Sequence, residues 1–207
     1  MAPTYEGVVC DEMDLRLLER VRGVDWTGPR VLDLACGTGR IGVWLRGRGA
    51  RGLTGVDFAP AMLEGARAKG VYDALKPADA TATGLAAGGC DLIVQSLADE
   101  HMKDLAPLYA ETARIAAPRA AFVIVGFHPH FLMSVMPTHF DGPDGQPLAV
   151  ESYVHLTADH VAAAHAAGWR LEAMEEGLID DAWVAKKPKW ERLRHHPVSF
   201  LMVWRRP

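Results

Sequence analysis

Hydrophobic and polar positions along the chain follow two periods, and their succession predicts strands and helices in turn. Short apolar runs that end at glycine, aspartate or proline are typical of buried strands, whereas apolar residues three or four positions apart are typical of helices. The expected strands are 31–35, 52–58, 71–76, 91–97, 120–127, 169–175 and 198–204. The expected helices are 11–21, 38–49, 60–70, 103–117 and 157–168.

Residues at the ends of these segments support the assignment. Pro60 stands where a helix accepts proline, at its first position, and the same helix is followed by Gly70. Thr157 is expected to be the N-cap of the last helix, and Gly168 follows its end. The repeated strand-helix order predicts an α/β fold, with a doubly wound, mostly parallel sheet and helices on both faces.

Two segments interrupt this order, at 128–156 and 178–197, and both are rich in aromatic residues, histidine and proline. The first carries apolar residues among polar ones, which favours an apolar lid over a small organic ligand, with a plain structural flap as the alternative. Within it, GPDG at 142–145 is typical of a hairpin tip. We therefore expect one domain over 1–207, with a substrate-lid insertion at 128–156.

Composition limits the classes of function. The 207 residues are 49% hydrophobic and 23% charged, with a formal net charge of −4. This is globular composition without a basic footprint, so nucleic acid is not expected as a partner. No apolar run approaches the roughly 20 residues of a membrane helix, and the N-terminus has no signal-peptide pattern. Three widely spaced cysteines favour reduced thiols, and a cytoplasmic location is expected.

The stretch VLDLACGTGRIG at 31–42 joins an expected strand to an expected helix through glycines. Gly37, Gly39 and Gly42 satisfy the G-x-G-x-x-G pattern of dinucleotide sites, and Asp57, about 20 residues on, is placed to bind a ribose. Both features fit any cofactor that carries adenosine. The glycines alone therefore leave the identity of the cofactor open.

Asp33, within the strand before the glycines, distinguishes between the candidates. A carboxylate repels the pyrophosphate of NAD but attracts a cationic ligand, most strongly at low dielectric. S-adenosylmethionine carries a sulfonium and an ammonium group and no phosphate, so Asp33 favours it. In the alternative interpretation, Asp33 only caps a turn or pairs with an arginine. Under the S-adenosylmethionine interpretation, Gly42 is incidental.

These residues resemble the first two motifs of the class I S-adenosylmethionine-dependent methyltransferases, in VLDLACGTGR and GVDFAPAML. The resemblance is good over 31–127 and implies a Rossmann-like, seven-stranded sheet whose last strand is antiparallel. It also implies that Asp57 holds the ribose hydroxyls, and that Asp79 and Ala80 meet the adenine, with Asp73 and Asp91 as nearby alternatives to Asp79. The cofactor-binding residues it implies are Tyr5, Asp33, Ala35, Gly37, Gly39, Asp57, Phe58, Met62, Asp79, Ala80 and Ser96.

Methyl transfer from a sulfonium requires alignment, exclusion of water and management of one proton. Candidate proton acceptors follow the ends of the fourth and fifth strands, where open α/β sheets bind ligands. They are Glu100, His101, His128 and His130, while Asp99 is expected to orient the acceptor or cap a helix, and His139 in the insertion is a further candidate. A metal site of Asp99, His101, His128 and His130 lacks compact ligand spacing, so no metal is expected.

The resemblance predicts transfer of a methyl group to a small-molecule acceptor by a monomer or homodimer. Three alternatives remain open at this stage. The cofactor can undergo non-methyl chemistry that releases methylthioadenosine, the protein can bind the cofactor without catalysis, or it can be an NAD-dependent oxidoreductase. Nothing in the sequence identifies the acceptor.

Overall fold

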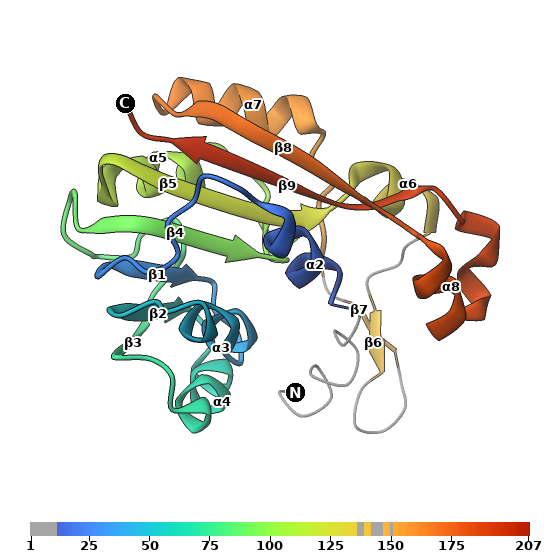
Figure 1. The fold of residues 1–207 in the computed structure, drawn as a ribbon, viewed down its shortest axis with the longest axis horizontal. Coiled ribbons are helices and arrows are strands. Elements are labelled where there is room, and N and C mark those ends of the chain that lie inside the picture. The colour runs from blue at the N-terminus through green and yellow to red at the C-terminus, as the bar shows by residue number, and fades with distance from the viewer. Residues whose placement is uncertain (1–11, 136–138, 142–146, 150) are drawn as a thin grey trace.

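A computed structural model describes residues 12–135, 139–141, 147–149 and 151–207, and shows a central sheet between two layers of helices (Figure 1). The sheet has seven strands in the order β3-β2-β1-β4-β5-β9-β8. β9 is antiparallel to both of its neighbours, and the pairs among the first five strands are parallel. The strands are β1 (Val31–Leu34), β2 (Leu53–Asp57), β3 (Ala74–Pro77), β4 (Cys90–Ser96), β5 (Ala116–Phe127), β8 (Arg170–Leu178) and β9 (Pro197–Arg205). The predicted fold class is confirmed.

Helices cover both faces of the sheet, as the strand-helix order predicts. Those on one face are α2 (Met13–Arg20), α3 (Arg40–Gly47) and α4 (Pro60–Lys69), and those on the other are α5 (Ala106–Ile115) and α7 (Thr157–Ala166) (Figure 1). In β4, Leu92 and Val94 pack into one apolar core and Ile93 into the other. A strand buried on both faces therefore appears in the sequence as a continuous apolar run.

Helix ends agree with the sequence in one case and differ in another. Pro60 is the first residue of α4, and Gly70 ends it in the left-handed conformation with φ 64°. The prediction that Thr157 caps α7 is wrong, because Thr157 is already helical. The Asp159 carboxylate instead accepts a hydrogen bond from the Leu156 backbone N–H at 2.8 Å, which stabilises the start of the helix.

The two interrupting segments lie beside the carboxyl ends of the central strands (Figure 1). The first contains α6 (Pro129–Val135) and a hairpin of β6 (His139–Asp141) and β7 (Pro147–Ala149); the expected tip at 142–145 lies outside the described residues. The second contains α8 (Asp181–Lys186) and the short helix η2 (Pro188–Leu193). Another short helix, η1 (Asp99–His101), follows β4.

Apolar residues join these segments to the rest of the domain. The C-terminal apolar cluster comprises Met13, Leu97, Phe131, Ile179, Trp183, Val184, Leu193 and Val198. Phe131 of α6 stacks on Trp190 of η2, with ring centroids 5.1 Å apart. Cys36 and Cys90 are free and buried. Within the described ranges, no helix combines the length and apolarity needed to cross a lipid bilayer.

Candidate cofactor and acceptor site

The turn from β1 into α3 has the backbone conformation that its glycines suggest. Gly37 and Gly39 have φ of 53° and 89°, in the left-handed region that glycine adopts without strain, and Gly39 is the N-cap of α3. Ala35 also has a positive φ, of 56°, which is uncommon for a residue with a Cβ. We refer to residues 35–39 as the glycine loop.

Asp57 ends β2 beside this loop. Its carboxylate accepts hydrogen bonds from the backbone N–H groups of Gly37, at 2.8 Å, and Ala59, at 2.9 Å. Asp57 therefore holds the glycine loop against the end of β2. Phe58, the next residue, has a side chain that is 77% exposed, and Met62 lies half-buried on the first turn of α4.

Asp33 lies beneath the glycine loop and is only 1% exposed. The Tyr72 hydroxyl donates a hydrogen bond to its Oδ2 at 2.5 Å. Burial is the largest influence on this carboxyl group and, with the nearby Asp57, raises its pKa to about 7, while the bond from Tyr72 acts in the opposite direction. Asp33 can therefore change its charge near neutral pH.

The prediction that Gly42 is incidental is wrong. A Cβ atom at this position would lie 2.1 Å from the Tyr72 hydroxyl oxygen, far inside van der Waals contact. Gly42 thus leaves the space through which Tyr72 reaches Asp33. The third glycine of the pattern has a packing role that the pattern itself does not reveal.

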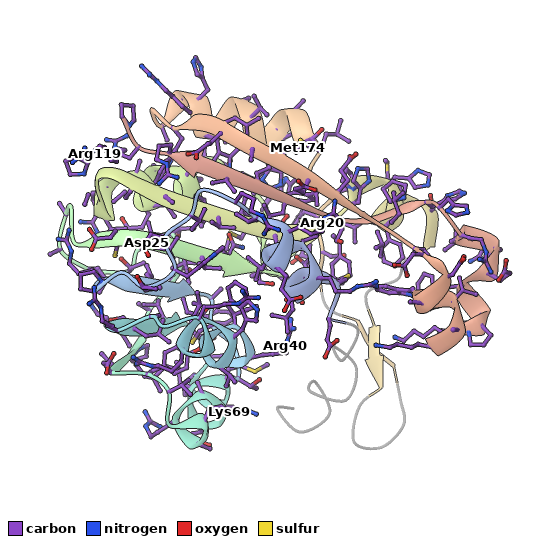
Figure 2. The ribbon with its side chains drawn as sticks, in the orientation of Figure 1. Arg20, Asp25, Arg40, Lys69, Arg119 and Met174 are labelled. Atoms are coloured by element: carbon purple, nitrogen blue, oxygen red, sulfur yellow. The ribbon has the colours of Figure 1, made fainter. Side chains whose placement is uncertain are left out.

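Asp14 of α2 is a buried polar residue that sequence reasoning missed. Its carboxylate accepts hydrogen bonds from Ser96 Oγ at the end of β4, at 2.6 Å, and from Arg40 Nη1 at 2.9 Å. Arg40, labelled in Figure 2, begins α3, so this ion pair joins α2 to the helix that follows the glycine loop. Tyr5, the expected contact of the methionine carboxylate, lies outside the described residues.

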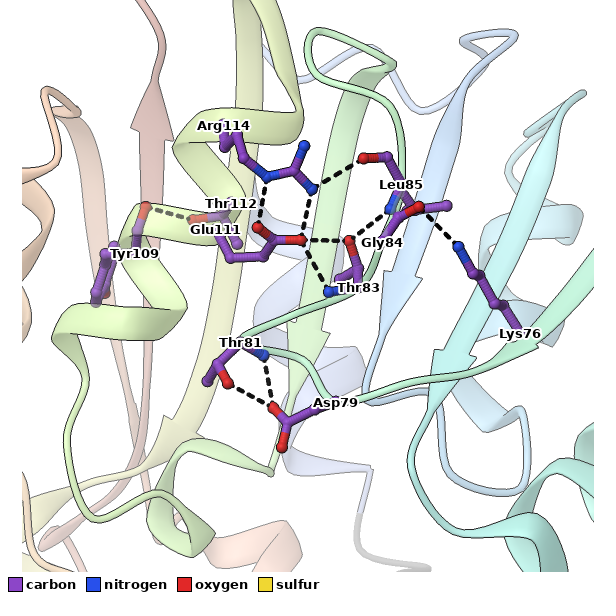
Figure 3. A network of polar contacts seen from close by, with 10 residues as sticks. All are labelled: Lys76, Asp79, Thr81, Thr83, Gly84, Leu85, Tyr109, Glu111, Thr112 and Arg114. Carbon is purple, nitrogen blue, oxygen red and sulfur yellow. Dashed lines mark hydrogen bonds and ion pairs between the residues drawn. The ribbon is translucent and has the colours of Figure 1, made fainter.

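Asp79 and Ala80 follow β3, on the same edge of the sheet as Asp57. Asp79 is exposed and accepts hydrogen bonds from the Thr81 backbone N–H and hydroxyl, each at 2.7 Å (Figure 3). The two alternatives to Asp79 as the adenine contact have other partners: Asp73 pairs with Arg46, and Asp91 pairs with Arg30.

A buried network fixes the segment that follows Asp79. Glu111 of α5 accepts the Thr83 backbone N–H at 2.8 Å and pairs with Arg114, whose guanidinium also donates to the Leu85 carbonyl at 2.9 Å (Figure 3). Arg114, and then the bonds from Thr83, lower the pKa of Glu111 to about 2. The carboxylate is therefore ionised at neutral pH and anchors this segment to α5.

Two adjacent carboxyl groups, Asp99 and Glu100, are buried in η1 beyond the end of β4, each 3% exposed. Asp99 Oδ2 lies 3.4 Å from His160 Nε2, and the Tyr109 hydroxyl lies 2.9 Å from His160 Nδ1. Burial first, and then the charge of Asp99, raise the pKa of Glu100 well above its ordinary value. Asp99 Oδ1 and Glu100 Oε2 have no hydrogen-bond partner among the residues that the structure describes.

Gln95 adds to this polar region. It pairs with Ile124 in the parallel β4–β5 register, so its side chain extends from the same face of the sheet as Ile124 and Gly126. A Cβ at Gly126 would lie 2.6 Å from Asp99 Oδ1, which places Asp99 against this face. Within the described part of the chain, neither amide atom of Gln95 has a hydrogen-bond partner.

The predicted histidines do not form one group. His101 is 37% exposed, with Nε2 3.8 Å from Glu100 Oε1 and Nδ1 3.3 Å from the Glu151 carbonyl oxygen. His101 thus lies at the surface of η1, next to the buried carboxyl pair. The side chain of His139 is outside what the structure describes.

His128 and His130 lie at the start of α6, where they contact residues of β8 and the approach to β9. His128 Nδ1 accepts the His130 backbone N–H at 3.1 Å, so the proton of the neutral ring is on Nε2, which faces Glu176 at 3.0 Å. His130 Nε2 lies 2.9 Å from His196 Nδ1. Over the described ranges, no three His, Cys, Asp or Glu side chains are arranged to hold a metal ion.

The sequence is similar to those of known methyltransferases. Residues 32–124 match a family model described as a methyltransferase domain. The chain is 32% identical over 187 residues to malonyl-[acyl-carrier protein] O-methyltransferase of Halorhodospira halophila, covering 86% of this chain and 59% of that protein. It is 35% identical over 106 residues to demethylmenaquinone methyltransferase of Thermus thermophilus, covering 48% of each. The chain thus spans about half the length of these curated relatives.

The fold matches that of solved structures over nearly the whole chain. An S-adenosylmethionine-dependent methyltransferase from Mesorhizobium loti superposes with a TM-score of 0.72 at 23% identity, covering 96% of this chain and 99% of that one. At this level of identity the likeness shows the shared fold. The chain thus contains a methyltransferase domain at 32–124 and has the fold of S-adenosylmethionine-dependent methyltransferases.

Proposed function

We propose that this protein transfers the methyl group of S-adenosylmethionine to a small-molecule acceptor and releases S-adenosylhomocysteine. One observation carries the proposal: the glycine loop with Asp57 lies at the carboxyl ends of β1 and β2, and a buried carboxyl pair lies beyond the end of neighbouring β4. Open α/β sheets bind ligands at this edge. The cofactor and the proton acceptor would thus lie side by side.

The cofactor would bind across the ends of β1, β2 and β3. Asp57 would accept hydrogen bonds from the ribose hydroxyls, and the exposed Phe58 would cover the adenine together with Met62. Asp79 would accept from the adenine amino group, and the backbone N–H of Ala80 would donate to a ring nitrogen. These are the roles that the family resemblance implies, and the position of the residues at one edge of the sheet supports them.

In the reaction, the acceptor atom attacks the methyl carbon as the carbon–sulfur bond breaks, and the bonding electrons remain on sulfur. The acceptor must then lose a proton. We assign this proton to the buried pair Asp99 and Glu100, which can share one proton because burial and the charge of Asp99 raise the pKa of Glu100. His101, at the edge of this pair, is the histidine best placed to pass the proton to solvent.

The geometry gives less support to His128 and His130 as proton acceptors. Nδ1 of His128 is occupied by a backbone N–H, and Nε2 faces a carboxylate. Both ring nitrogens of His128 are therefore engaged by the protein, so neither is free for the acceptor. The ring instead links α6 to β8. His130 is similarly paired with His196.

The name of one relative, demethylmenaquinone methyltransferase, supports a small organic acceptor. The test is to incubate the protein with methyl-labelled S-adenosylmethionine and a cell extract divided into small-molecule, protein and nucleic-acid fractions. We expect label in the small-molecule fraction, reduced by Glu100→Gln. Label in the protein or nucleic-acid fraction alone would contradict the proposed acceptor class.

A further inference from the structure

Tyr72 lies between α4 and β3, outside the sequence motifs, yet its hydroxyl reaches the acid beneath the glycine loop. It donates a hydrogen bond at 2.5 Å to Asp33, which is 39 positions earlier in the chain. Asp33 is fully enclosed, so this bond determines where its carboxyl group points. A residue of the α4–β3 connection thereby controls a group of the cofactor site.

Three glycines form the slot that holds the Tyr72 ring. Added Cβ atoms would lie 2.1 Å from its hydroxyl oxygen at Gly42, 2.9 Å from ring carbon Cε1 at Gly55, and 3.0 Å from Cε2 at Gly39. These glycines belong to α3, β2 and the glycine loop, so bare backbone from three parts of the site contacts one phenol. The slot leaves the hydroxyl a defined position against Asp33.

The charged and titratable groups around Asp33 come from every element that packs on it. Asp57 approaches from β2, Cys36 from the glycine loop, Arg40 from α3 and Tyr72 from the α4–β3 connection. Burial raises the pKa of both the Cys36 thiol and the Tyr72 phenol, so each remains neutral. Asp33, whose pKa is about 7, is the member of this group that changes charge near neutrality.

We propose that Tyr72 is a positioning residue that, through Asp33, makes the cofactor site prefer the cationic S-adenosylmethionine to the product S-adenosylhomocysteine. This inference rests on the proposed function. An ionised carboxylate in a low-dielectric site attracts the sulfonium, and methyl transfer abolishes that positive charge. The attraction that helps to bind S-adenosylmethionine is therefore lost when S-adenosylhomocysteine forms. This loss favours replacement of the product by a new molecule of S-adenosylmethionine.

The inference is tested by calorimetric titration of the wild type with each ligand between about pH 6 and about pH 8.5. The quantity of interest is the Kd for S-adenosylhomocysteine divided by that for S-adenosylmethionine, because groups common to both ligands cancel in this ratio. We expect the ratio to rise about tenfold as Asp33 ionises, equivalent to one pKa unit of coupling. Asp33→Asn should make it independent of pH.

Tyr72→Phe keeps the ring in its slot and removes only the hydroxyl that stabilises ionised Asp33. The rise in the ratio should therefore move to higher pH by about one unit, the scale of a hydrogen bond to a charged group. Gly42→Ala should shift it in the same direction, because its Cβ displaces the hydroxyl. Thr27→Val removes a hydroxyl that donates to Asp25 at 2.7 Å, before the start of β1 and at the opposite end of the strand from the glycine loop; it is the matched control and should leave the profile unchanged.

A ratio that does not vary with pH in the wild type would overturn the inference, as would a Tyr72→Phe profile that superimposes on that of the wild type. Either result would leave the proposed function intact, because both ligands would still bind. If the folded wild type does not bind S-adenosylmethionine at all, the proposed function and this inference fail together. Thermal denaturation of each variant confirms that the titrated protein is folded.

Discussion

The Asp57 carboxylate has a structural role in the folded protein in addition to its proposed role in cofactor binding. Its carboxylate holds the backbone N–H groups of Gly37 and Ala59, and the proposed cofactor site would present two ribose hydroxyls to the same group. Hydrogen bonds to a charged acceptor contribute roughly 1.5–3 kcal/mol each. Removal of this carboxylate therefore affects both the ligand and the loop that receives it.

Asp57→Ala should weaken S-adenosylmethionine binding by about tenfold to about a hundredfold, measured by calorimetric titration. Asp73→Ala is the control, because Asp73 is an exposed aspartate at the opposite end of the neighbouring strand, where it pairs with Arg46. The Asp73→Ala variant should bind S-adenosylmethionine with the same affinity as the wild type. Equal affinities for the Asp57 variant and the wild type would remove Asp57 from the cofactor site.

Glu100 and Glu111 should affect the pH dependence of stability in opposite directions. The pKa of Glu100 is raised in the folded state by burial and by Asp99, so the folded protein holds a proton there that the unfolded chain releases. The contribution of Glu100 to the free energy of unfolding is fully present below the ordinary glutamate pKa. It is lost as the pH rises through the raised pKa of the folded state. Glu100→Gln should therefore gain stability relative to the wild type as pH increases from about 4.5 towards alkaline values.

The pKa of Glu111 is lowered to about 2 by Arg114 and Thr83, so its contribution is present above the ordinary glutamate pKa and lost as pH falls towards about 2. Glu111→Gln should thus lose stability relative to the wild type at neutral pH, and less in acid. Urea denaturation of both variants across this pH range measures the two trends. If the stability of both variants relative to the wild type changed in the same direction with rising pH, the assigned environments of Glu100 and Glu111 would be contradicted.

At the scale of elements, the sequence predicted the central strands well because each is apolar on both faces and ends at a marked residue. The helix expected over 103–117 stops at Ile115, and β5 begins at Ala116, two residues before Pro118. Proline lacks the N–H that a strand ladder requires, and the β4–β5 register shifts between Cys90 and Leu92, opposite this stretch. Pro118 indicated that regular structure is interrupted here. It did not indicate that the interruption lies within β5 and not at the end of the helix.

The short helices α6, α8 and η2 were not predicted, because six or seven residues are too few to show a helical period. Tertiary contacts stabilise them instead, through the C-terminal apolar cluster. Leu97, which follows β4, belongs to this cluster, so the cluster also supports the segment that leads into η1. Packing of the two interrupting segments and the position of the proposed acceptor site are thereby linked.

Trp183→Ala should cost about 3–5 kcal/mol of unfolding free energy, the usual range for removing a buried tryptophan from a core. Hydrogen exchange should accelerate mainly in 129–135 and 181–193, while the β1 and β4 amides stay protected. Trp190→Phe, which keeps an aromatic ring on Phe131, is a milder companion variant. Uniform acceleration across the whole sheet would show that the cluster is not a separate cooperative unit.

At the scale of the molecule, the residues of the proposed site that were expected from the sequence are those that lie close together in the chain. The glycine loop and Asp57 were predictable because turns and strand ends carry recognisable residues. Asp14, Tyr72 and His160 were not, because each comes from a distant segment whose apolar neighbours resemble ordinary core residues. Their roles depend on which buried polar atoms meet after folding, and periodicity holds no information about that.

The central claim is that the cofactor loses its methyl group and nothing else. The most direct measurement follows the leaving group by mass spectrometry, after the purified protein is incubated with S-adenosylmethionine and the small-molecule fraction of a cell extract. The account predicts S-adenosylhomocysteine in an amount equal to the methyl groups transferred. Methylthioadenosine in its place, or S-adenosylmethionine that remains unconsumed, would contradict it.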